Sequence, residues 1–205
     1  MVIYEGDIRK YIRENYKLIK EKRFDDLFQG LEKPGWLFPG NQLMYLLTEA
    51  GYDVLENVEH IYSNMYYKNE NIITFTVPSH IRTIKHKAFY KCKNLEKLII
   101  DIPITEISYQ MCSCCNNLTE ITIPDTVEHI NSEAFYRCTN LSNFVLPSSI
   151  TKIDEGAVVE TTFTSIGYNG TMKQFKATKL HLRKLWRAGS KINTVSCIDG
   201  EIVLK

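Results

Sequence analysis

The 205-residue chain contains no long hydrophobic run, and no window of it approaches the roughly eighteen apolar residues of a membrane-spanning helix. Near the start, Glu5, Asp7, Arg9 and Lys10 interrupt any apolar stretch, so this segment does not resemble a secretory signal. The formal net charge is only +1, which gives no overall field toward nucleic acid or membrane. We therefore expect a cytoplasmic protein without a membrane partner.

The sequence also lacks the motifs of common catalytic sites. It has no Gly-rich phosphate loop, no Gly-x-Ser-x-Gly and no His-Glu-x-x-His. The segment Cys112-Ser113-Cys114-Cys115 is dense in thiols, but a zinc site usually needs two separated ligand pairs. Packed, reduced thiols are favoured over a metal or redox site. We predict that the protein is not an enzyme and uses no cofactor or metal.

What the sequence does contain is a repeat of 23 residues. One apolar column consists of Ile61, Ile84, Ile107, Ile130 and Ile153. A second, three residues earlier, consists of Val58, Ile81, Ile104, Val127 and Ile150. A third contains Cys92, Cys115 and Cys138. The register holds until about Thr162, where one residue is missing. Units of this size cannot bury an apolar side alone, so they are expected to stack around a shared core.

Each repeat predicts one strand and one tighter segment. Residues 118–123 alternate like a strand, and Pro124 ends it. Residues 132–138 suit a short helix or turn. The resulting pattern, IPxxVxxIxxxAFxxCxxL from Ile123 to Leu141, resembles the BspA-like leucine-rich-repeat family. The third copy departs from it, with Asp101 for proline and Met111-Cys112 for Ala-Phe, so its local packing is expected to differ.

The resemblance implies protein recognition, often by surface or secreted adhesins. Without their signal peptide, the chain looks more like the short cytosolic versions from bacteria and their phages. We predict an α+β repeat fold, a leucine-rich-repeat solenoid of about five 23-residue units with a cap at each end. The predicted parts are a helical N-terminal cap (1–53), the solenoid (54–168) and a C-terminal cap of a basic helix plus a β-hairpin (169–205).

The caps are predicted in more detail from helical periodicity and turn residues. In the N-terminal cap, helices are expected over 7–22 with Asp7 as N-cap, over 24–31, and over 41–50 ended by Gly51. The first should bury Ile8, Tyr11, Ile12, Tyr16 and Ile19. In the C-terminal cap, a helix is expected over 172–188 and a hairpin around Asp199-Gly200. Trp36-Leu37-Phe38 is interpreted as cap core, with an exposed anchor for a partner as the alternative.

Two outward surfaces are candidates for binding a partner protein. The first is the solvent side of the strand in each repeat, formed by Thr74, Thr76, Lys97, Ile99, Glu120, Thr122, Asn143 and Val145. The second is a ladder of Tyr67, Tyr90 and Tyr136 with Lys68, Lys91 and Arg137 beside them, because Tyr and Arg are favoured at interfaces. The alternatives are an unused strand surface and tyrosines that simply cover the turn.

The stretch from 161 to 198 has no acidic residue. Its seven basic residues are Lys173, Lys176, Lys179, Arg183, Lys184, Arg187 and Lys191. This pattern suits a solvated helix face or an acidic protein partner, and nucleic acid is the less favoured reading. The predicted function is therefore non-catalytic binding or occlusion of an unidentified partner protein. One version is a phage or host-interaction factor that inhibits a defence protein; the alternatives are a nucleic-acid-associated protein and an adhesin-like surface fragment.

Overall fold

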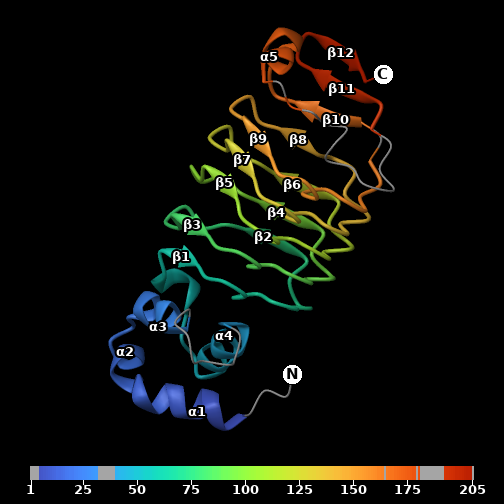
Figure 1. Ribbon diagram of the computed structural model, residues 1–205. Helices are drawn as coiled ribbons and strands as arrows, with labels where there is room; N and C mark the ends of the chain where they lie inside the picture. Colours follow the sequence, from blue (N-terminus) through green and yellow to red (C-terminus); the bar gives the residue numbers. More distant parts are fainter. Residues whose placement is uncertain (1–4, 32–39, 164, 179, 181–191, 205) are drawn as a thin grey trace.

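The chain forms a solenoid with helices at its N-terminal end (Figure 1). The computed structural model describes residues 5–31, 40–163, 165–178, 180 and 192–204. The repeats stack as successive coils, and a helix with a strand pair closes the far end (Figure 1). The predicted leucine-rich-repeat solenoid of about five turns is confirmed. No helix in the described part of the chain is long and apolar enough to cross a membrane.

Two rows of short parallel strands run along the solenoid (Figure 1). The first row contains β1 (His60–Ile61), β3 (Thr83–Ile84), β5 (Glu106–Ile107), β7 (His129–Ile130) and β9 (Lys152–Ile153). The second contains β2 (Thr74–Thr76), β4 (Lys97–Ile99), β6 (Glu120–Thr122) and β8 (Val145–Leu146). Within the rows, paired residues are 23 apart, as in Phe75, Leu98 and Ile121. At the last pairing Val145 lies opposite Gly167, only 22 residues on, which confirms the missing residue near Thr162.

The apolar columns form one continuous core between the two rows. Ile61, Ile107 and Ile130 have no exposed surface. The cysteine column adds hydrogen bonds between coils, because the Cys92 thiol donates to the Tyr66 carbonyl at 2.9 Å and Cys115 to that of Phe89 at 3.0 Å. Cys138 repeats the contact with the Cys112 carbonyl at 3.1 Å. A thiol suits this column because it fills a small buried space and still offers a donor.

The segments expected as short helices or turns are turns. In each coil two residues, four positions apart, take left-handed backbone conformations. These pairs are Asn64 and Lys68, Lys87 and Lys91, Gln110 and Cys114, Glu133 and Arg137, and Gly156 and Glu160. Alternate amides of the turn point along the solenoid axis, so Tyr66 N–H donates to Ala88 O and Lys68 N–H to Tyr90 O, both at 2.9 Å. Hydrogen bonding between coils therefore offsets the steric cost of the left-handed residues.

The third copy is packed differently, as its sequence predicts. In the second, fourth and fifth copies the residue of the second apolar column closes a turn on the residue three before it, as Val127 N–H does on Pro124 O. In the third copy Ile104 N–H bonds Ile102 O instead, across Pro103. The first strand row is interrupted between β3 and β5, and the buried Ser108 hydroxyl donates to Ile84 O at 2.9 Å. A side chain thus supplies a contact between coils where the strand pairing stops.

The N-terminal cap contains α1 (Glu5–Glu14), α2 (Tyr16–Lys20), α3 (Phe24–Leu31) and α4 (Gly40–Glu49), followed by a 3-10 turn (Leu55–Asn57). The single helix predicted over 7–22 is wrong, because the helix breaks at Asn15, whose side-chain amide bonds Tyr11 O at 3.0 Å. Asp7 lies inside α1 and is not its N-cap. Tyr16 is 60% exposed rather than inward. The helices at α3 and α4 are confirmed, and Gly51 ends α4 with φ +82°.

Side chains of the cap seal the open edge of the first coil. In the inner coils, the residue after the second apolar column donates its backbone N–H to a carbonyl of the preceding coil, as Arg82 N–H does to Glu59 O. Glu59 has no preceding coil, and the Asp25 carboxylate accepts its N–H at 2.9 and 3.1 Å. Asp25 also accepts from the Tyr62 hydroxyl at 2.9 Å. On the turn side, the Asn41 amide donates to Tyr67 O at 2.8 Å. The Asp25 carboxylate and the Asn41 amide therefore bond backbone groups of the first coil that would bond a preceding coil if there were one.

The C-terminal end is closed by strands. β10 (Ser165–Tyr168) pairs with β8 and with β11 (Thr194–Cys197), which forms an antiparallel hairpin with β12 (Gly200–Val203). The predicted hairpin is confirmed, but its turn is Ile198-Asp199, and Gly200 already belongs to β12. α5 (Met172–Ala177) starts with a capping box between Thr171 and Gln174. The described helix stops at Ala177, and the predicted continuation over 181–188 lies outside the described residues.

Candidate binding surfaces

The outward side of the second strand row lies where the alternation predicts. Phe75, Leu98 and Ile121 point into the core, and the residues on either side of them face outward. Of the eight candidate residues, five are exposed and three half-buried: Thr74, Thr76, Lys97, Ile99, Glu120, Thr122, Asn143 and Val145. We call these eight the strand face. Its role in binding stays a prediction.

The strand face combines one ion pair with a row of β-branched residues. Lys97 Nζ lies 2.9 Å from Glu120 Oε1 across β4 and β6, so these opposite charges satisfy each other. In the neighbouring row, Ile99 pairs with Thr76 and Thr122. Val145 lies 41% exposed farther along the solenoid. Small and β-branched side chains form a flat surface with little rotamer entropy to lose on binding.

The tyrosine ladder is present, but it differs between coils. Tyr67 and Tyr90 stack with ring centroids 5.6 Å apart and planes 7° apart. Lys68 lies over the Tyr67 ring and Lys91 over the Tyr90 ring, at 5.2 and 5.1 Å. The third coil has the buried Ser113 in this column, so the ladder is interrupted there.

In the fourth coil the ladder residues are committed to each other and to a carboxylate. Arg137 lies over the Tyr136 ring at 5.1 Å, and its Nε lies 2.7 Å from Glu160. The Tyr136 hydroxyl donates to the same carboxylate at 2.9 Å. These contacts lower the pKa of Glu160 through the Arg137 hydrogen bond first and the Tyr136 one second. Tyr136 and Arg137 therefore form an internal cluster rather than an extension of the Tyr67–Tyr90 stack.

The structure adds two residues that the sequence analysis missed. Lys87, in the second coil, reaches over the ring of Tyr109 in the third at 5.9 Å, and Tyr109 is 40% exposed. Their 22-residue separation is off the repeat, so no column contains both. A local charge count would have pointed to the area: residues 60–95 hold six Lys and Arg but only one acidic residue, Glu70, a net charge of +5 with His neutral.

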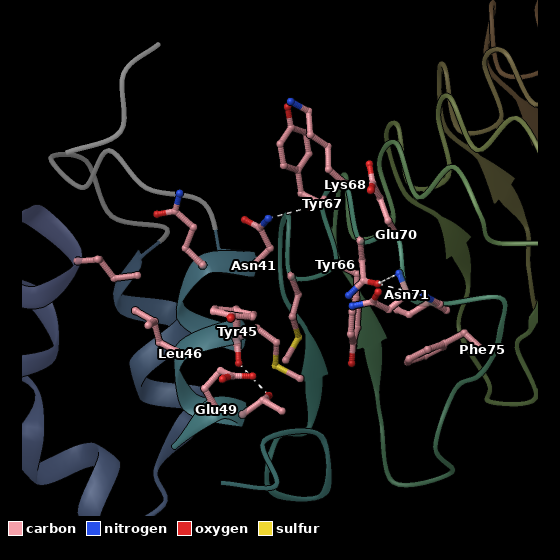
Figure 2. Close-up of a pocket in the computed structure, with 17 residues that line it drawn as sticks. Asn41, Tyr45, Leu46, Glu49, Tyr66, Tyr67, Lys68, Glu70, Asn71 and Phe75 are labelled. Atoms are coloured by element: carbon pink, nitrogen blue, oxygen red, sulfur yellow. Dashed lines mark hydrogen bonds between the residues drawn. The ribbon is translucent and has the colours of Figure 1, made fainter. Parts of the chain in front are cut away.

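A cleft of about 950 Å³ separates α4 from the first coil (Figure 2). Its α4 side includes Asn41, Tyr45 and Glu49, and its solenoid side includes Tyr66 and Lys68. Figure 2 shows the Asn41 amide bonded to Tyr67 at the edge of this space. Because the amide nitrogen is used on Tyr67 O, the oxygen of Asn41 is fixed as an acceptor, and it is buried without a partner in the described part of the chain. No sequence pattern indicates this cleft.

The cysteines are placed as packing residues. Cys112 and Cys115 are fully buried, as their columns predict, and Cys114 is half-buried. Burial raises the pKa of the Cys112 and Cys115 thiols, which keeps them protonated and weakly nucleophilic. Among the described residues, no three His, Cys, Asp or Glu side chains are arranged to hold a metal ion.

The predicted basic patch can be placed only in part. Lys173 and Lys176 are exposed on α5. Lys179, Arg183, Lys184, Arg187 and Lys191 lie outside the described residues. Trp36-Leu37-Phe38 also lies outside them, so both interpretations of this segment stay predictions.

Solved structures with the same fold come from bacteria. A leucine-rich cell surface protein from Faecalibacterium prausnitzii is 25% identical, with a TM-score of 0.52 over 60% of this chain and 32% of that one. The pneumococcal vaccine antigen PcpA is 16% identical, with a TM-score of 0.52 over 66% of this chain and 38% of that one. The chain thus spans about a third of the length of each. A comparison with curated proteins found no match.

The repeat itself matches a family model. Six copies of the BspA type leucine-rich repeat region match residues 59–180, more than half of the chain. This range includes the Ile61 and Cys92 columns, both strand rows and the start of the C-terminal cap. With the repeat period, the strand rows and the family match in agreement, the chain belongs to the BspA-type leucine-rich-repeat family.

Proposed function

We propose that this chain is a protein-recognition module that binds its partner through the strand face. The proposal rests on the row Thr76, Ile99 and Thr122, which parallel strand pairing holds in register on the outside of three coils. Leucine-rich-repeat proteins are generally protein-binding or adhesin-like surface modules and typically not enzymes. A rigid row of small side chains gives a partner a preorganised surface at low entropic cost.

The test is an affinity capture from native lysate with a matched pair of variants. Ile99→Lys/Thr122→Lys places two charges on the strand face. Asn117→Lys/Asn140→Lys places two charges on exposed positions also one coil apart, outside the strand row. We expect one protein to be retained in stoichiometric amount by the wild type and the Asn variant, and lost by the strand-face variant. Equal retention by all three proteins would overturn the strand face as the binding surface.

We also propose a kind of partner and a cellular compartment for the interaction. One form is a phage or host-interaction factor that occludes a larger enzyme or a defence protein, which predicts a stoichiometric complex with reduced activity of the target. For the setting we propose the cytoplasm, whereas the F. prausnitzii relative is described as a cell surface protein. Fractionation of native cells separates the two, since detection in the envelope fraction alone would exclude the cytoplasmic version.

A further inference from the structure

The first coils present cations that have no carboxylate partner. Lys68, Lys87 and Lys91 form no ion pair within the described part of the chain. By contrast, Arg82 is paired with Glu59 and Arg137 with Glu160. The three lysines lie instead over tyrosine rings, at 5.2, 5.9 and 5.1 Å from the ring centroids. An ammonium over a ring keeps its positive charge available to an external anion.

The backbone holds these lysines in a fixed array. All three have left-handed φ values, between 56° and 62°. Their amides bond the next coil, Lys68 to Tyr90 O, Lys87 to Tyr109 O and Lys91 to Ser113 O, at 2.9 to 3.0 Å. The cations are therefore carried by a hydrogen-bonded ladder and not by a free loop, so little backbone order is lost when a partner binds.

We propose that this surface, which we call the lysine–tyrosine surface, binds an acidic segment of a partner polypeptide. It consists of Lys68, Lys87, Lys91, Tyr67, Tyr90 and Tyr109. Residues 60–95 have a net charge of +5, and carboxylates of the partner neutralise this positive charge. Tyrosine hydroxyls can donate hydrogen bonds to the same carboxylates.

The geometry favours carboxylates over nucleic acid. Surfaces for single strands offer open aromatic faces on which bases stack. Here Tyr67 and Tyr90 stack on each other, and a lysine lies over each ring. The rings are thus engaged within the protein, while the ammonium groups remain without carboxylates.

This inference goes beyond the proposed function, because the lysine–tyrosine surface lies on the turns and not on the strand face. The two can fail separately. The strand-face variant Ile99→Lys/Thr122→Lys leaves all six residues of the lysine–tyrosine surface unchanged, so it should bind an acidic peptide as the wild type does.

The test is fluorescence anisotropy with a labelled ten-residue peptide of alternating Glu and Gly, at low and moderate salt. Its Gln counterpart and a ten-nucleotide oligothymidylate are the comparison probes, with inorganic phosphate as a competitor. The variant Lys68→Gln/Lys87→Gln/Lys91→Gln is compared with Lys10→Gln/Lys17→Gln/Lys20→Gln, which removes the same charge from exposed lysines of the N-terminal cap. Because three charge contacts are lost, we expect the first variant to bind about tenfold more weakly and the second within about twofold of wild type.

Further variants keep the experiment decisive if the Gln triple folds poorly. The Arg triple at positions 68, 87 and 91 should retain binding, and Lys91→Gln alone should weaken it about twofold. Circular dichroism and thermal unfolding check each variant. Equal losses in the two Gln triples, equal binding of the Gln peptide, tighter binding of oligothymidylate, displacement by millimolar phosphate, or no binding to wild type would each overturn the proposal.

Discussion

The first two coils and the last two coils of the solenoid share one backbone pattern and carry opposite charge. Residues 60–95 have a net charge of +5, whereas residues 124–160 contain six acidic and two basic residues, a net −4. Yet the Ile column, the paired strands and the left-handed turn residues recur in both regions. Buried columns and backbone pairing therefore set the fold, while the outward positions are free to differ.

The two regions also use their charges differently. In the last coils Lys152 lies 2.8 Å from Asp154 and Arg137 lies 2.7 Å from Glu160, so both basic side chains form ion pairs within the protein. In the first coils Lys68, Lys87 and Lys91 contact aromatic rings. The same turn columns thus stabilise the coil at one end and offer charge to a partner at the other.

The largest expected effect tests whether the two regions are equally well packed. Phe89 and Phe135 occupy one column, and neither is exposed. Truncation to Ala should cost about 3 to 5 kcal/mol at either site. Phe89 should cost more by about 0.5 to 1.5 kcal/mol, because it contacts two rings, Tyr66 at 5.3 Å and Phe75 at 5.0 Å, and Phe135 contacts one, Phe144 at 5.3 Å. Urea unfolding measures both, with Phe→Leu at each site as the volume control; equal losses would show that the ring stack adds nothing.

A smaller effect should distinguish the two ends. The first coil is sealed by Asp25, whose carboxylate accepts Glu59 N–H and the Tyr62 hydroxyl, whereas strands seal the last coil. Asp25→Ala should destabilise the protein by about 1.5 to 2 kcal/mol, and Asp25→Asn by less because one oxygen remains. Hydrogen exchange should rise around residues 59–62 and stay unchanged around 145–168. Equal increases at both ends would contradict a local sealing role.

Much of the fold was predictable because each buried position carries the same kind of residue in every repeat. The columns at Ile61 and Cys92, the outward strand face and the missing residue near Thr162 all follow from a fixed period. The caps follow no period. The break at Asn15 depends on one side-chain bond to Tyr11 O, which competes locally with helix continuation.

The candidate surfaces were predictable only where they follow a column. Tyr67 and Tyr90 are in register, so their stacking was accessible. Lys87 reaches Tyr109 diagonally between coils, and Arg137 is tied to Glu160 in the next coil. Whether a charge is free or paired depends on side-chain reach across coils, which the alignment of columns does not contain.

The turn columns permit a matched test of backbone strain in the two regions. Lys87 in the second coil and Gly156 in the fifth occupy one column, with φ of 57° and 84°. Gly156→Ala should cost about 1 kcal/mol through the left-handed backbone alone, since a Cβ there would meet nothing closer than Glu133 Cγ at 4.0 Å. Lys87→Gly should raise stability by about 0.5 kcal/mol, because relief of strain exceeds the added freedom of the unfolded chain. Unfolding midpoints check both signs, and a destabilised Lys87→Gly would mean that its side chain contributes more than its backbone costs.

An effect of similar size is expected in the pH dependence of the acidic coils. Burial alone would raise the pKa of Asp154, but the hydrogen bonds and charges of Lys152 and His129 outweigh burial and lower it. A carboxyl whose pKa is lower in the folded state stabilises the protein above its unfolded pKa, and this contribution disappears as the pH falls through the folded value. Asp154→Asn should therefore cost up to about 1 kcal/mol at pH 7 and progressively less as the pH falls through the folded pKa of Asp154. Urea midpoints of both proteins across this range measure the difference, and a gap that persists in acid would show that Asp154 acts through packing and not through its charge.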